Sequence, residues 1–282
     1  MNLQNIISEI EKVDPEIYDR LDTRRNVMKD FAKTSGKVAL AALPFALGSM
    51  FQKAYGSPTG PKDIIIDTLN FALTLEFLEA NFYIKAVASQ IIPASDTSSF
   101  MTIRDHENEH VAFLISAIKG SGGTPVSKTA ADFDYTAKGN FPGVFTDYGT
   151  MCAVAQTFED TGVRAYKGQA PNLISNNDVL TAALQIHSVE ARHAARLREI
   201  RRANGLLVPG GVVVKPWITM NQSGIGSPVV QPTYNGEENV VQAGVTITGI
   251  GGQAISANAA SEAFDEPLTK DQVIAIVTPF FA

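Results

Sequence analysis

This chain contains an internal repeat of four residues. A pattern of glutamate, tyrosine, glutamate and histidine occurs twice with the same spacing, and the second copy begins 83 positions after the first. The two copies are Glu76, Tyr83, Glu107 and His110, and Glu159, Tyr166, Glu190 and His193. Separations of three and seven positions place side chains on one face of a helix. The repeat therefore predicts two similar helical hairpins.

The pairing of the two copies is more informative than either motif alone. With 14 glutamates in 282 residues, a given histidine has about a 5% chance of following a glutamate by three positions, so a lone match is weak evidence. Two such pairs among four histidines is a coincidence of about 1–2%, before the matched spacings are considered. We therefore interpret the eight residues as one constellation.

Residues 60–205 are expected to form the helices that carry this constellation. The sequence predicts helices over about 63–92, 97–119, 146–168 and 177–204, with Pro93 ending the first and Gly205 ending the last. About twenty-five residues of little periodicity separate the second helix from the third, and the other two connections are short. Short, long and short connections are typical of an all-α four-helix bundle with one long crossover.

The residues before the bundle resemble an export signal. Arg24 and Arg25 lie in "TRRNVMK" and precede a moderately apolar run over 38–51. We expect residues 1–56 to be a twin-arginine-type leader, which makes the twin-arginine export machinery a partner and the periplasm the destination. An uncleaved leader would hold the protein at the membrane. The alternative is an amphipathic or buried helix of the mature protein.

The residues after the bundle have a different composition. Residues 206–282 begin with a Gly/Val-rich arm, which predicts short strands or ordered loops. Near the end, Thr269 and Gln272 have the spacing of a capping box ahead of an apolar segment. We therefore expect a short terminal helix that docks on the bundle.

The composition of the chain excludes several classes of function and site. The net charge of −6 argues against a nucleic-acid partner, which usually requires a basic surface. A single cysteine, Cys152, excludes an intrachain disulfide framework and a cysteine-rich zinc site. No stretch reaches the ~18 apolar residues of an ordinary transmembrane helix.

Burial gives the repeated residues a chemical meaning. Four carboxylates in an apolar bundle core are costly without compensation, and two divalent metal ions supply the four positive charges required. One glutamate from each of two helices and a Glu-x-x-His from each of the others is the ligand set of di-iron and di-manganese bundles. Zinc usually recruits fewer carboxylates. The predicted ligands of two iron or manganese ions are Glu76, Glu107, His110, Glu159, Glu190 and His193.

Roles within the set also follow from position. Glu107 and Glu190 are the expected bridges between the two ions. Tyr83 and Tyr166 are either hydrogen-bond partners of the ligands or ordinary core tyrosines.

Several neighbouring residues compete for these roles. Glu79 shares a face with Glu76, but its counterpart in the second copy is Gly162, so the repeat favours Glu76. The remaining candidates are expected outside the ligand set, namely His106, Glu109, Cys152, Asp160 and His187. The arginines that follow Glu190 are expected to form a solvated face that compensates the helix dipole.

The quoted segments resemble a known family. "LNFALTLEFLEANFYIKA", "RDHENEHVAFLISAI", "TFEDTGVRAYKGQAPNL", "SVEARHAARLREI" and the closing "AFDEPLTKDQVIAIVTPFF" are similar to ferritin-like proteins related to plant desiccation-related proteins. The resemblance covers residue 60 to the end, with a less typical insertion at about 206–260. It implies a ferritin-like four-helix bundle, but the family's biochemical role is poorly defined.

Two functions are therefore open from the sequence. The favoured one is a di-iron or di-manganese oxidoreductase, ferroxidase-like or catalase-like, that reacts with oxygen or peroxide in oxidative or desiccation stress. The alternative is a non-enzymatic envelope stress or structural protein that retains the bundle. In either case a homo-oligomer remains open.

Overall fold

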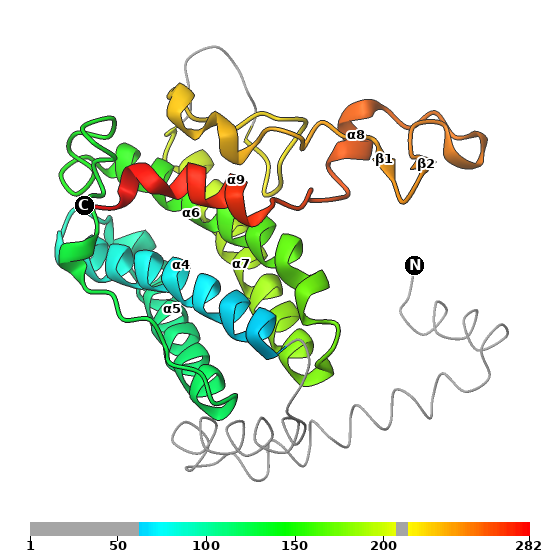
Figure 1. Ribbon diagram of the computed structural model, residues 1–282. Helices are drawn as coiled ribbons and strands as arrows, with labels where there is room; N and C mark the ends of the chain where they lie inside the picture. Colours follow the sequence, from blue (N-terminus) through cyan, green and yellow to red (C-terminus); the bar gives the residue numbers. More distant parts are fainter. Residues whose placement is uncertain (1–61, 207–213) are drawn as a thin grey trace, which may run out of the picture. The chain divides into compact units, whose positions relative to one another are not determined.

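The computed structural model describes residues 62–206 and 214–282, so the expected leader over 1–56 lies outside the described residues. Four long helices form the bundle, and they pack as two hairpins (Figure 1). They are α4 (Lys62–Ala88), α5 (Ala94–Gly120), α6 (Tyr148–Gln169) and α7 (Asn177–Ala203). The long α5–α6 connection contains only the short η1 (Ala130–Asp132), and η2 (Ala170–Leu173) follows α6. The expected all-α bundle with one crossover is confirmed.

The helix ends follow local sequence signals, with one difference from expectation. The first helix ends at Ala88 rather than near residue 92, because Gln90 adopts a left-handed φ of 61° that an α-helix cannot continue. The caps of the second hairpin are the short polar side chains typical of helix starts: Asp147 accepts from the Thr150 amide, and Asn176 accepts from two amides of α7. Gly205 follows α7 with a φ of 66°, as expected for a helix terminus.

The C-terminal extension is mostly loops and short elements. Two two-residue strands pair antiparallel as the hairpin labelled β1 and β2 in Figure 1. The elements are η3 (Pro228–Thr233), β1 (Val241–Gln242), β2 (Val245–Thr246), η4 (Ile250–Gly252), α8 (Ala257–Ser261), α9 (Lys270–Val277) and η5 (Thr278–Phe280). The capping box of Thr269 and Gln272 is present at the start of α9.

The terminal helix α9 docks on the bundle beside α6. Val273 and Val277 are buried in the same apolar core as the bundle helices. Just before α9, the Leu268 amide donates to the Arg164 carbonyl oxygen (3.1 Å). A side chain at Gly168 would lie 1.9 Å from the Leu268 carbonyl oxygen, so a glycine is required for this close approach. None of the helices in the described ranges is long and apolar enough to span a membrane.

A group of buried polar side chains joins the C-terminal extension to the bundle. Its arginines correct the expectation that the arginines after Glu190 form a solvated face. Arg198 and Arg201 are 4% and 3% exposed, so they do not belong to a solvated face. The extension covers this side of α6 and α7, and its backbone carbonyls accept hydrogen bonds from Arg164 and Arg201. The group, called here the arginine cluster, consists of Gln156, Asp160, Arg164, Arg198, Arg201, Tyr234 and Glu237.

Candidate metal centre

The six predicted ligands meet inside the bundle. They come from all four long helices, and each is at most 8% exposed. The carboxylate–histidine cluster that they form comprises Glu76 on α4, Glu107 and His110 on α5, Glu159 on α6, and Glu190 and His193 on α7. The helical spacing of each Glu-x-x-His pair places both side chains on the face that turns toward the bundle axis.

The cluster divides into two overlapping groups. Within each group, one ligand atom per residue lies within 4.8 Å of the others. The first group is Glu76, Glu107, His110 and Glu190, and the second is Glu107, Glu159, Glu190 and His193. Glu107 and Glu190 belong to both groups, and each remaining glutamate and histidine belongs to one. The structure thus brings together four potential ligands around each of two centres, with two carboxylates shared.

The distances within the groups fit metal coordination. His110 Nδ1 lies 3.1–3.2 Å from oxygens of Glu76, Glu107 and Glu190. His193 Nδ1 lies 2.9 Å from Glu107 Oε1 and 3.1 Å from Glu159 Oε2. Two ligand atoms that each lie ~2.1 Å from one ion, at right angles, are ~3.0 Å apart. The buried glutamates and histidines are therefore compatible with a di-metal site.

The hydrogen bonding of the cluster is incomplete at the two shared carboxylates. Among the described residues, Glu107 Oε1 and both oxygens of Glu190 are buried and have no partner in hydrogen-bond geometry, although His193 Nδ1 lies 2.9 Å from Glu107 Oε1 and His110 Nδ1 lies 3.2 Å from Glu190 Oε1. A buried carboxylate oxygen without a partner is costly, and buried charges in proteins are normally paired or bound to metals. The unpaired oxygens belong to the residues common to both groups.

The protonation of these side chains reflects the excess of negative charge. Burial, together with the neighbouring carboxylates of Glu107 and Glu159, raises the pKa of Glu190 well above its usual range. Burial also raises the pKa of Glu107, to about 7. Burial alone would lower the pKa of His193, but the carboxylates of Glu159 and Glu107 raise it to about 11. Without metal, protons take up part of the charge that the carboxylates carry.

The two tyrosines connect the hairpins. The Tyr83 hydroxyl on α4 donates to Glu159 on α6, and the Tyr166 hydroxyl on α6 donates to Glu76 on α4. Both tyrosines are buried. Each tyrosine therefore orients the non-shared glutamate of the opposite copy, which is how outer residues commonly support metal ligands.

A fifth buried carboxylate lies beside the cluster. Glu79 is 4% exposed, and burial together with the charges of Glu190 and Glu159 raises its pKa well above the usual range. A side chain at Gly162 would lie 2.9 Å from Glu190 Oε2 and 3.4 Å from Glu79 Oε1. The absence of a side chain at Gly162 therefore leaves room mainly for the Glu190 carboxylate, and Glu79 lies beside the same space. Repeat symmetry gave no signal for this residue, because only one copy has it.

The other competing residues lie outside the cluster. The exposed His106 has its Nδ1 2.9 Å from His193 Nε2, so it contacts the outer edge of a predicted ligand. His187 Nδ1 lies 3.0 Å from the Val163 carbonyl oxygen, away from the carboxylates. Cys152 is buried with a free thiol, Glu109 is exposed, and Asp160 belongs to the arginine cluster.

Comparison with known proteins supports the architecture. Residues 65–203 match the family model described as the ferritin-like domain, a range that contains all six residues of the carboxylate–histidine cluster. No curated protein matches the chain closely enough to count as a relative. The narrower resemblance to desiccation-related proteins stays a prediction.

Proposed function

Because residues 65–203 form a ferritin-like domain, we propose that this chain holds two iron or manganese ions in the carboxylate–histidine cluster and reacts with oxygen or peroxide. A role in protection against oxidative or desiccation stress is part of the same proposal. The observation that carries it is the overlap of two four-residue groups at two buried carboxylates, of whose four oxygens only Glu107 Oε2 has a partner in hydrogen-bond geometry. The four carboxylates also outnumber the two histidines, and no arginine or lysine in the described part of the chain pairs with them, so the cluster needs further positive charge.

The chemistry of the donors favours iron or manganese. Four carboxylates and two imidazole nitrogens form a mixed oxygen and nitrogen donor set. Iron and manganese bind such a set better than a set rich in sulfur. Glu107 and Glu190 would be shared between the two ions, and the other residues would each hold one. When bound, the ions supply redox electrons and open coordination positions for the oxidant.

The protein's own residues prepare the site. Tyr83 and Tyr166 fix the carboxylates of Glu159 and Glu76 by hydrogen bonds across the bundle. His193 presents Nδ1 to the carboxylates while its Nε2 contacts His106. All six cluster residues are buried, which keeps bulk water from the ligands and strengthens electrostatic interactions there.

The test compares metal content and turnover in two variants of one helix. Wild-type protein expressed in its native host is expected to contain about two iron or manganese ions per chain, and to disproportionate peroxide or oxidise ferrous iron. Glu107→Ala should lose both metal and turnover. Glu109→Ala is the matched control, because Glu109 lies two positions away on α5 and is exposed. Wild-type protein that is folded, metal-free and inert would contradict the proposal and favour the non-enzymatic alternative.

A further inference from the structure

A small apolar cavity lies inside the bundle, separate from the carboxylate–histidine cluster. Its volume is about 20 Å³, and side chains from all four long helices line it. The wall includes Ala72, Leu75, Leu114, Tyr166, Ala183 and Ile186. None of its lining residues is exposed. The cavity is therefore part of the bundle interior.

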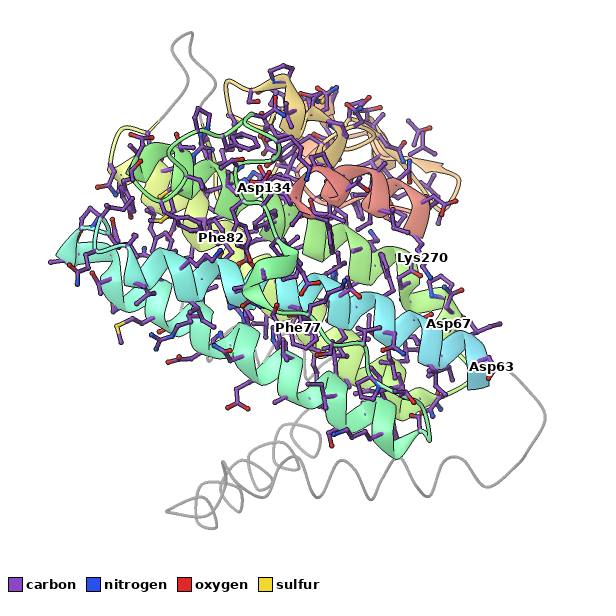
Figure 2. The ribbon with its side chains drawn as sticks, turned by 60° about the vertical axis from the view of Figure 1, so that its left-hand side comes forward. Asp63, Asp67, Phe77, Phe82, Asp134 and Lys270 are labelled. Atoms are coloured by element: carbon purple, nitrogen blue, oxygen red, sulfur yellow. The ribbon has the colours of Figure 1, made fainter. Side chains whose placement is uncertain are left out.

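The helical positions of the lining residues place the cavity next to the cluster. Leu114 lies four positions after His110 on α5, and Ile186 lies four positions before Glu190 on α7. Four residues of helix correspond to ~6 Å along the axis. The cavity thus lies about one turn from the ligands, toward the end of the bundle where α4 begins. Asp63 and Asp67 mark that end of α4 in Figure 2.

One side chain belongs to both places. Tyr166 lines the cavity, and its hydroxyl donates a hydrogen bond to Glu76 in the cluster. A molecule in the cavity is therefore separated from a predicted metal ligand by the width of a tyrosine side chain. This proximity is the reason to connect the cavity with the chemistry of the centre.

Size and polarity select what the cavity can hold. A volume of this size accommodates about one water-sized molecule, and a buried water requires two to four polar partners. The wall offers few, since its polar side chains are Thr68, Tyr166 and Gln169 and its other residues are aliphatic or aromatic. The Tyr166 hydroxyl is already bonded to Glu76, and Gln169 Oε1 accepts from Asn172 (3.0 Å). Hydrogen peroxide, which has two O–H donors, would lose hydrogen bonds on entering. An apolar diatomic molecule loses none.

We propose that this cavity is a holding site for dioxygen on its way to the metal centre. The inference rests on the proposed function and sharpens it, because it selects dioxygen over peroxide as the oxidant that approaches through the bundle. Peroxide, being polar, would have to reach the ligands by another route.

Xenon tests the cavity without metal. Xenon is an apolar atom that occupies dry apolar cavities. Crystals of the metal-free full-length chain under xenon pressure are expected to show one xenon site between Leu114 and Ala183. In Ala183→Val two added methyl groups fill the space, so the site should disappear. The matched control Ala182→Val makes the same change at the adjacent position, which does not line the cavity, and should retain the site.

Reaction kinetics test the route in metal-loaded protein. The bimolecular rate with dioxygen should fall about fivefold or more in Ala183→Val, while the rate with peroxide and the metal content stay at wild-type values. Ala182→Val should match wild type with both oxidants. Metal analysis separates the two levels of inference, since a chain that binds no metal contradicts the proposed function whatever xenon does. Bound metal together with no xenon site, or with equal effects on both oxidants, overturns the dioxygen route alone.

Discussion

The protein contains two buried polar clusters that share the helices α6 and α7 but differ in charge. The arginine cluster has three guanidinium groups and two carboxylates, and the extension adds backbone carbonyls as acceptors. The carboxylate–histidine cluster has four carboxylates, and its only potential cations are two histidines. The first cluster therefore contains its own compensating charge, whereas the second requires protons or metal ions from outside.

Unpaired atoms alone do not distinguish the two clusters. Glu237 Oε2 and Arg201 Nε in the arginine cluster also lack hydrogen-bond partners among the described residues, as do the oxygens of Glu107 and Glu190. The clusters differ in net charge. They also differ in arrangement, because the ligand atoms of the carboxylate–histidine cluster gather in two groups that share Glu107 and Glu190. Arg164 forms an ion pair with Glu237 at 2.7 Å, but the glutamates of the other cluster have no arginine or lysine within ion-pairing distance in the described part of the chain. Compensated charge indicates a structural role, and uncompensated charge indicates a ligand.

The largest effect is expected in the compensated cluster. Arg164 is 1% exposed and donates to Asn235 and Glu266 carbonyls besides pairing with Glu237. Arg164→Met leaves those carbonyls without this donor and leaves the buried Glu237 carboxylate without its cation, so it should lower the free energy of unfolding by about 3–5 kcal/mol. Chemical denaturation of metal-free protein measures this change. Metal content per folded chain should not change.

Two further variants check the cause. Arg196→Ala on the exposed face of α7 is the control and should change stability by less than about 0.5 kcal/mol. Adding Glu237→Leu to Arg164→Met removes the orphaned carboxylate and should restore part of the lost stability. If the double variant is no more stable than the single one, the Glu237 charge is not the source of the loss.

The second prediction concerns the uncompensated cluster and depends on metal. Burial and the neighbouring carboxylates raise the pKa of Glu190 well above its usual range, which favours the neutral acid in metal-free protein. Glu190→Gln should therefore change the stability of metal-free protein little. At a metal concentration about 100 times Kd, wild type should gain about 2.7 kcal/mol, and the variant should gain almost nothing. Thermal unfolding with manganese and with a chelator measures both. Glu199→Gln, on the same helix with a side chain 44% exposed, is the control. An equal metal-dependent gain in Glu190→Gln would remove Glu190 from the ligand set.

The contrast between the clusters explains how much the sequence could predict. The carboxylate–histidine cluster lies within two copies of one local pattern, so helical spacing and the 83-residue offset were sufficient to bring its six residues together. The arginine cluster depends on which surface the extension covers. Arg198 and Arg201 have the spacing of any helical face, and their burial arises from Tyr234 and neighbouring loops far along the chain.

Glu79 shows a second limit. It has no partner in the repeat, so symmetry argues against it, and only the packing shows that its carboxylate is buried next to Glu190 and Gly162. The early end of the first helix has a similar origin. The helix ends early because Gln90 adopts a left-handed φ. Glutamine has no strong preference for that conformation, so the sequence did not indicate it.

The third prediction uses pH to expose the uncompensated charge. The pKa of Glu107 is raised to about 7 in the folded protein, so between about pH 4.5 and 7 the folded state binds more protons than the unfolded state. This contribution to stability is present at low pH and is lost as the pH rises through 7. Glu107→Gln cannot ionise, so metal-free variant should exceed wild type at pH 8 by about 1–3 kcal/mol and converge with it near pH 5. Parallel pH–stability curves for the two proteins would show that Glu107 carries no uncompensated charge.

The smallest effect compares one tyrosine from each cluster. Tyr83 donates to Glu159, and Tyr234 donates to Asp160 (2.7 Å), so Tyr→Phe removes one hydrogen bond to a buried carboxylate in both cases. Tyr234→Phe also removes the acceptor of the Gln156 amide (3.0 Å). Each change should lower the free energy of unfolding by about 1–2 kcal/mol. Only Tyr83→Phe should also weaken metal binding, by about tenfold, because Glu159 loses the group that orients it. Isothermal titration with manganese distinguishes the two. Equal weakening of manganese binding by Tyr234→Phe would mean that the two clusters are coupled through α6, on which Glu159 and Asp160 are adjacent. The charge balance of the arginine cluster would then support the geometry of the metal ligands.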